Sequence, residues 1–188
     1  MQYLVFFGAF VNFLGSVYYL KETIQGKNKP NRVSFFLWGT VPLIGVAASL
    51  SDGVGLAVVP VLFAGLTPLM IFFASFFNRK SYWQLQRFDY ACGGASILAL
   101  TLWAITRDPN IAILFALIAD GFAAIPTIKK AWTHPDSETA ASYAGGLFGQ
   151  FTVIFALETF AFSEIAFPIY LACANTVILF SIYHKKIL

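Results

Sequence analysis

The sequence predicts an all-helical integral membrane protein with seven transmembrane helices. Of its 188 residues, 59% are apolar and only 11% are charged, whereas soluble domains are about 45–50% apolar and about 25% charged. A soluble domain of this length has too little interior to bury so many apolar side chains. The net charge of +3 and the two cysteines also argue against a nucleic-acid-binding protein and a disulfide-rich secreted domain.

Seven apolar runs follow one another along the chain. They cover residues 3–20, 33–50, 56–77, 88–105, 110–128, 142–161 and 165–183. The segments between consecutive runs are residues 21–32, 51–55, 78–87, 106–109, 129–141 and 162–164. Each run is close to the ~20 residues that cross a bilayer, and none alternates with period two as a barrel strand does. Because a backbone in lipid must satisfy its own hydrogen bonds, we expect each run to be a helix.

Two boundaries in this series need a separate argument. The break between the second and third runs is only Ser51-Asp52-Gly53, but a merged run would be about twice as long as a span. The first run follows Met1-Gln2 without a basic residue. A cleaved signal peptide has a basic segment there, so we expect this run to remain as a helix.

The basic residues predict how the chain is oriented. Eleven of the twelve Lys and Arg residues lie after the first, third, fifth and seventh runs: Lys21, Lys27, Lys29, Arg32, Arg79, Lys80, Arg87, Lys129, Lys130, Lys185 and Lys186. Seven spans place all of these on one side of the membrane and only Arg107 on the other. Since cytoplasmic loops are rich in Lys and Arg, we expect the N-terminus outside and the C-terminus in the cytoplasm.

The first and last three runs form an internal repeat, in which residues 1–80 align without gaps over 109–188. Each half has a basic segment after its first run, a nearly uncharged turn after its second, and a proline (Pro60 or Pro168) near the start of its third. The predicted architecture is a three-helix bundle (1–80), a linker helix (81–108) and a second three-helix bundle (109–188). The linker helix returns the chain across the membrane, so the two bundles are parallel.

The second half also carries a motif at the end of its first run. It reads Pro126-Thr127-Ile128-Lys129-Lys130, and Ser142-Tyr143 opens the next run. Together with the 3+1+3 layout, this resembles the Pro-Gln-Ile motif of the SWEET and PQ-loop (MtN3-like) transporter superfamily, although neither half keeps the glutamine. The resemblance implies substrate-binding side chains on the third and seventh helices, where Thr67 and Asn175 stand. It also implies a hinge proline, and Pro126 stands in that place.

Asp120 is the most informative polar residue. It lies near the middle of the fifth run, and no Lys or Arg lies inside any run. A carboxylate at the bilayer centre costs about 2.5–3.5 kcal/mol on insertion scales, so a proton, a cationic substrate or hydrogen-bond partners must offset that cost. Asp120 is therefore either a proton-coupling or substrate-contacting acid, or a protonated acid bonded to a neighbouring helix.

Four further polar residues lie within the runs: Asn12, Gln150, Asn175 and Thr67. Asn12 is the repeat partner of Asp120, and Thr67 is that of Asn175. We expect these side chains to line a central cavity, with helix-to-helix bonds as the alternative for the amides. For the Thr67 hydroxyl, the alternative is a bond back to its own helix.

These observations leave three functions open. The first is a small polar-solute transporter working by alternating access, either alone or coupled to a proton through Asp120. The second is a ligand-binding receptor of the KDEL-receptor type, and the third is a structural or lipid-handling protein. No nucleophile–base or metal-ligand motif is present in the sequence, so we expect no enzyme activity, metal or other cofactor. The substrate, the coupling ion, the cellular membrane and a homo-oligomeric state stay open.

Overall fold

The computed structural model describes residues 2–51, 59–106 and 109–187. This part of the chain folds into seven α-helices and two short 3₁₀-helices, η2 (Arg79–Ser81) and η3 (Pro135–Ser137). The α-helices are α1 (Gln2–Gln25), α2 (Arg32–Ser51), α3 (Val59–Ala74), α4 (Arg87–Ile105), α5 (Pro109–Thr133), α6 (Ala140–Ala156) and α7 (Phe162–Ile187). The all-helical prediction is confirmed, with one α-helix at each apolar run.

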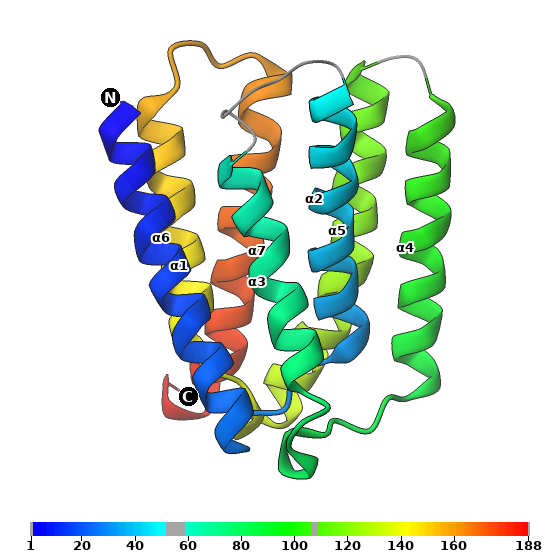
Figure 1. The fold of residues 1–188 in the computed structure, drawn as a ribbon, viewed down its shortest axis with the longest axis vertical. Coiled ribbons are helices and arrows are strands. Elements are labelled where there is room, and N and C mark those ends of the chain that lie inside the picture. The colour runs from blue at the N-terminus through cyan, green and yellow to red at the C-terminus, as the bar shows by residue number, and fades with distance from the viewer. Residues whose placement is uncertain (1, 52–58, 107–108, 188) are drawn as a thin grey trace.

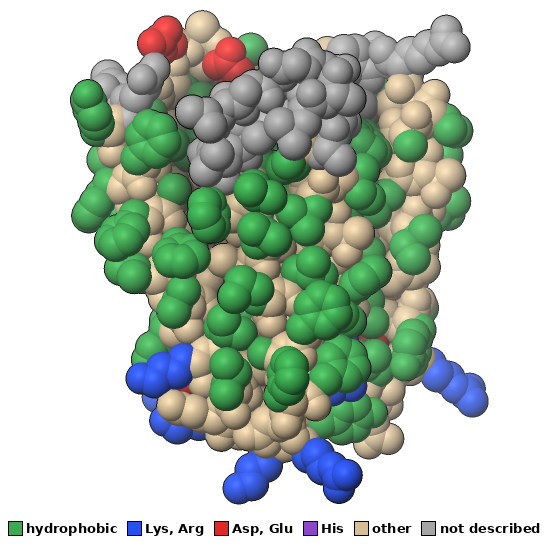
Figure 2. Space-filling view, viewed as in Figure 1, with side chains coloured by type: hydrophobic (Ala, Val, Ile, Leu, Met, Phe, Trp, Pro, Cys, Tyr) green, Lys and Arg blue, Asp and Glu red, His purple; other side chains and the backbone are tan. Residues whose placement is uncertain are grey.

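Three segments of the described chain are long and apolar enough to cross a membrane: Tyr3–Gln25, Arg87–Ile105 and Phe162–Lys186. The helices run roughly side by side along the long axis of the molecule, with the C-terminus at the lower end of Figure 1. Lys and Arg side chains gather at that lower end, and hydrophobic side chains cover the middle of the same face (Figure 2). We call this lower end of the molecule the basic end. Arg107 and the break at Asp52-Gly53 lie outside the described residues.

The helix ends differ from the apolar runs where polar groups cap or extend the helix. α1 continues past its apolar run to Gln25 and stops at Gly26, the one described residue with a φ of +75°. The Gly26 and Lys27 amides donate to the carbonyls of Thr23 and Glu22 at 3.1 and 2.9 Å. This pair of bonds satisfies the last carbonyls of the helix and requires a left-handed residue, for which glycine carries the smallest steric cost.

The helices pack in a pattern that repeats between the two halves. α3 lies between α1 and α2, and α7 lies between α5 and α6. The halves meet where α1 packs against α6 and where α2 packs against α5. Each of these contacts has a counterpart when α1, α2 and α3 are exchanged for α5, α6 and α7. The remaining helix, α4, packs mainly on α5 and also touches α2.

Glycines set the close approach of α1 to α6. A Cβ atom at Gly15 would lie 2.4 Å from the backbone oxygen of Ala141, and one at Gly145 would lie 3.0 Å from the backbone of Asn12. Backbone atoms cannot move aside as a flexible side chain can. The G-x-x-x-G spacing of Gly145 and Gly149 on α6 therefore serves packing within the molecule, against α1.

A central cavity and its closed end

A cavity of about 690 Å³ lies between the two halves and is lined by residues from all seven α-helices. Its lining includes every mid-run polar residue that the sequence singles out: Asn12, Thr67, Asp120, Gln150 and Asn175. The structure thus brings together side chains from α1, α3, α5, α6 and α7. A volume of this size is in the range of about 300–1,000 Å³ that small-molecule sites occupy. Pro126 does not line the cavity.

Asp120 is the acidic side chain of the cavity. The Tyr170 hydroxyl on α7 donates a 2.8 Å hydrogen bond to Asp120 Oδ2. The bonds of the described residues leave the second carboxylate oxygen, Oδ1, without a protein donor, and the side chain is only partly buried. Among the described lining residues Asp120 is the single Asp, Glu, Lys, Arg or His.

Two hydroxyl groups of the cavity donate to backbone carbonyls. Thr67 donates to Phe63 of its own helix at 3.0 Å, and Ser96 on α4 donates to Ala119 on α5 at 2.7 Å. Thr67 therefore lines the cavity and makes the own-helix bond that the sequence left as its alternative. Each oxygen keeps lone pairs that can accept a further hydrogen bond.

Three amide side chains line the cavity, and small residues of α6 make room for two of them. A Cβ at Gly146 would lie 3.0 Å from Asn175 Oδ1, and one at Gly149 would lie 3.7 Å from the Asn12 Cβ. Asn175 Nδ2 donates one N–H to the Leu171 carbonyl at 2.8 Å, so its oxygen and its second N–H are left for the cavity. The side-chain amides of Asn12 and Gln150 make no hydrogen bond to another described residue.

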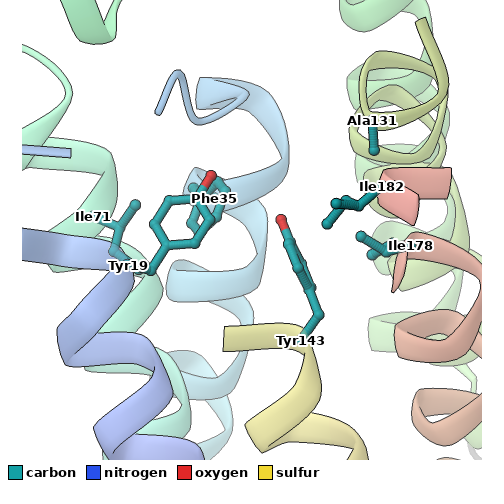
Figure 3. Packing of buried hydrophobic residues seen from close by; sticks show 7 residues of the cluster. All are labelled: Tyr19, Phe35, Ile71, Ala131, Tyr143, Ile178 and Ile182. Carbon is teal, nitrogen blue, oxygen red and sulfur yellow. The ribbon is translucent and has the colours of Figure 1, made fainter. Parts of the chain in front are cut away.

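Packed aromatic and aliphatic side chains close the cavity toward the basic end. Tyr19, Phe35, Ile71, Ala131, Tyr143, Ile178 and Ile182 form one buried cluster. Figure 3 shows Tyr143 between side chains of the first half on one side and side chains of the second half on the other. Phe35, Ile71, Tyr143 and Ile178 also line the cavity. The cluster is therefore the floor of the cavity, and it joins the two halves.

A buried ion pair lies beneath this floor. Lys130 Nζ is 2.6 Å from Glu138 Oε1, and both side chains are almost completely buried. The hydroxyls of Tyr19 and Tyr143 donate to the other carboxylate oxygen of Glu138 at 2.7 and 3.0 Å. Lys130 also donates to the backbone carbonyl of Lys29 in the first half. Buried charges are tolerated when they are paired and hydrogen-bonded in this way.

The loops around the ion pair are bonded to each other across the two halves. Asn28 Nδ2 donates to Thr139 Oγ1 at 2.7 Å, and that hydroxyl donates to Glu22 Oε2 at 2.6 Å. The Lys29 amide donates to the Ser137 carbonyl at 2.8 Å. We call the ion pair, its two tyrosines and these loop bonds the polar latch. Because the bonds of the latch run between the halves, they hold the two halves together at the basic end.

Pro126 lies at the crossing of α5 and α2, next to the latch. It is inside α5 and fully buried. The neighbouring Thr127 hydroxyl donates to Ser34 Oγ at 2.9 Å, and Ser34 donates to the Ala123 carbonyl at 2.5 Å. A proline removes one helix hydrogen bond, so this crossing is a weak point of α5. A hinge at Pro126 stays a prediction.

Sequence reasoning missed two features of this region. The first is Tyr170, the hydrogen-bond partner of Asp120. Its position along the sequence could have indicated the contact, because α5 and α7 start at the same end of the molecule and each residue lies about a third to half of the way along its helix. The second is the ion pair. Lys130 is read from sequence as one of the basic residues that set orientation, and Glu138 is not singled out, whereas both side chains are buried.

No family model, curated protein or solved structure matches this chain.

Proposed function

We propose that the chain is a multi-pass membrane protein that carries a small polar solute by alternating access. In this proposal all seven α-helices span the bilayer, the N-terminus is outside, and the basic end and the C-terminus are cytoplasmic. The two halves rock about the central cavity, with the polar latch closing its cytoplasmic side. The proposed solute contacts are Asp120, Asn12, Gln150, Asn175 and Thr67.

The surface supports membrane insertion. Large apolar side chains are exposed along several helices, with Phe10 at 57%, Phe73 at 56% and Leu98 at 61%. Soluble monomers rarely expose apolar patches larger than a few hundred Å². The Lys and Arg residues at one end fit the charge bias of a cytoplasmic surface (Figure 2).

The cavity is the observation that carries the transport proposal. It lies between two halves whose contacts repeat, as alternating-access proteins built from repeats place their substrate sites. Its polar side chains come from both halves, so a change in the relative position of the halves changes the site. A receptor for a peptide carboxylate needs a cation to hold that group. None of the described lining residues is Lys, Arg or His, which favours transport over this alternative.

The orientation is tested by fusing a reporter that fluoresces only in the cytoplasm to the C-terminus. The proposal expects a fluorescent fusion, and the same reporter at the N-terminus should stay dark. A dark C-terminal fusion of a protein that is inserted and folded would contradict the orientation.

Transport is tested with the purified full chain. Sugars, amino acids and amines are first screened for thermal stabilisation, and stabilising solutes are then tested for counterflow in proteoliposomes. We expect counterflow of at least one such solute, and a change in its pH dependence between pH 5 and 8 in Asp120→Asn if that acid couples a proton. Glu158→Gln, at an exposed acid outside the cavity, is the matched control. A solute that binds without counterflow would instead favour a receptor.

A further inference from the structure

The hydrogen-bonding groups of the central cavity are unevenly divided between donors and acceptors. The hydroxyls of Thr67 and Ser96 donate to backbone carbonyls, and the hydroxyl of Tyr170, beside the lining, donates to Asp120 Oδ2. Asn175 donates one amide N–H to Leu171 and keeps its oxygen and its second N–H. Donors open to a ligand come from the side-chain amides of Asn12, Gln150 and Asn175, from the Trp38 indole and from one hydroxyl of the Ser16–Ser142 pair. Each of these groups except the indole also offers an acceptor, so acceptors outnumber donors once the oxygens of Asp120, Thr67 and Ser96 are added.

The charge of the cavity points in the same direction. Asp120 is the single Asp, Glu, Lys, Arg or His among its described lining residues, and its one described partner is a neutral hydroxyl. A ligand that brings a positive charge would neutralise this carboxylate and donate to the surplus acceptors. Ammonium groups have donors and no acceptor, so they match both features.

The rest of the lining describes the body of the ligand. Aromatic side chains from three helices line the cavity: Phe35, Trp38, Tyr143 and Phe167. Most of the other lining residues are Val, Leu, Ile, Ala, Pro or Gly. An apolar or aromatic body is buried favourably against such walls, and aromatic faces also attract cations. A carboxylate on the ligand would meet no Lys, Arg or His among the described lining residues, and would lie in the field of Asp120.

We propose that the cavity binds an organic ammonium ion with an apolar body and without a carboxylate, held through Asp120. The proposal rests on the proposed function in one respect, because it takes the cavity as the place of the carried solute. It goes further by excluding amino acids and sugars as the preferred class. A zwitterion carries a carboxylate that the cavity repels, and a sugar brings no charge to pair with Asp120.

The test uses four probes that share one phenyl body. They are 2-phenylethylamine, 2-phenylethanol, phenylalanine and 3-phenylpropionate, and their binding to the full-length protein in lipid nanodiscs is measured by calorimetry. We expect the amine to bind about tenfold or more tightly than the alcohol and phenylalanine, with the propionate weakest, since a charge-assisted bond in a cavity is worth at least that factor. Equal affinities for amine and alcohol, or tighter binding of phenylalanine, would overturn the proposal.

Variants locate the effect at one side chain. Asp120→Asn keeps the shape of the residue and an acceptor for Tyr170, and it should reduce the amine affinity to that of the alcohol. Glu158→Gln removes the same charge at an exposed site and should leave the amine preference unchanged. Loss of the preference in Glu158→Gln as well would overturn the assignment to Asp120. The four-probe series on the unmodified protein gives its answer even if Asp120→Asn does not fold.

Counterflow separates this inference from the transport proposal. The probe is radiolabelled 2-phenylethylammonium, and protein-free liposomes give the rate at which its free base crosses the bilayer unaided. Protein-dependent counterflow that is lost in Asp120→Asn supports both proposals. Tight amine binding without any counterflow contradicts transport and leaves the site assignment supported. Counterflow of a sugar or an amino acid but not of the cation contradicts the ammonium site and leaves transport supported.

Discussion

The basic end and the central cavity treat polar side chains in opposite ways. At the basic end, Lys130, Glu138 and the two tyrosines satisfy one another, and the loops of the two halves are bonded across their junction. In the cavity, Asp120 keeps one oxygen without a described donor, and Asn12 and Gln150 make no described side-chain bond. At the basic end, polar groups bond to one another within the protein, and these bonds stabilise the fold. In the cavity, polar groups without a protein partner can bond to a ligand.

This contrast assigns different costs to substitutions in the two regions. A group of the latch has partners that are buried with it, so its removal leaves those partners unsatisfied. A cavity group that faces a hydrated or ligand-filled space leaves little behind when it is removed. Substitutions at the basic end should therefore lower stability, while substitutions in the cavity should change ligand binding and leave stability nearly unaltered.

The largest effect is expected at the ion pair. Lys130→Met removes the cation and leaves the buried Glu138 carboxylate without a counter-charge, which costs about 3–5 kcal/mol in comparable buried pairs. The free energy of unfolding is measured by denaturation with sodium dodecyl sulfate. Its neighbour Lys129 is exposed and lies 4.2 Å from the centre of the Phe88 ring, so Lys129→Met should lower the free energy of unfolding by about 1 kcal/mol or less. Similar losses in both variants would contradict a latch centred on Lys130.

A smaller loss is expected where α1 meets α6. In Gly15→Ala the new Cβ would lie 2.4 Å from the Ala141 carbonyl oxygen, and a forced shift of packed helices costs about 1–3 kcal/mol. Gly94 on α4 is the matched control, because a Cβ there meets no atom within 4 Å. Gly94→Ala should leave the free energy of unfolding unchanged or raise it slightly, since alanine favours helix. Equal effects of the two variants in the same denaturation assay would show that the α1–α6 approach is looser than described.

The same contrast explains which parts of the fold follow from the sequence. The helices do, because each apolar run is long enough to need one. Their ends do not, since α1 and α5 continue through polar residues such as Thr23 and Lys130 that are buried. Apolar runs report which residues avoid water. They carry no information about polar residues that find partners within the protein.

The cavity and the latch differ in predictability for a related reason. A polar residue inside an apolar run is costly, so Asp120 and Asn175 stand out in the sequence, and both line the cavity. Tyr170 does not stand out, because tyrosine is common in membrane helices. Lys130 is hidden by a competing explanation, since basic residues at the ends of spans also set orientation. Seven spans and the orientation stay predictions, with three helices of the described chain long enough to cross a membrane.

Tyr170 is a structural partner of a cavity residue, and Tyr170→Phe tests how much its bond to Asp120 stabilises the fold. The variant removes the 2.8 Å bond to Asp120 and should lower the free energy of unfolding by about 1 kcal/mol, the usual net value of one hydrogen bond. Tyr183 is also on α7 and is exposed, so Tyr183→Phe is the control and should have no measurable effect. A loss of several kcal/mol in Tyr170→Phe would place Asp120 with the latch, as a structural acid whose bond holds α5 to α7.

The smallest effect is expected at Thr67, which the sequence pairs with Asn175. Its hydroxyl proton is spent on the Phe63 carbonyl, and valine has nearly the same shape, so Thr67→Val should change 2-phenylethylamine affinity by less than about twofold. Asn12→Leu removes an amide that makes no described bond to the protein and should weaken the same probe several-fold, with both affinities measured by calorimetry. A larger loss of affinity in Thr67→Val than in Asn12→Leu would contradict this expectation. In that case, whether a polar side chain already has a hydrogen-bond partner within the protein would not identify the residues that hold the solute.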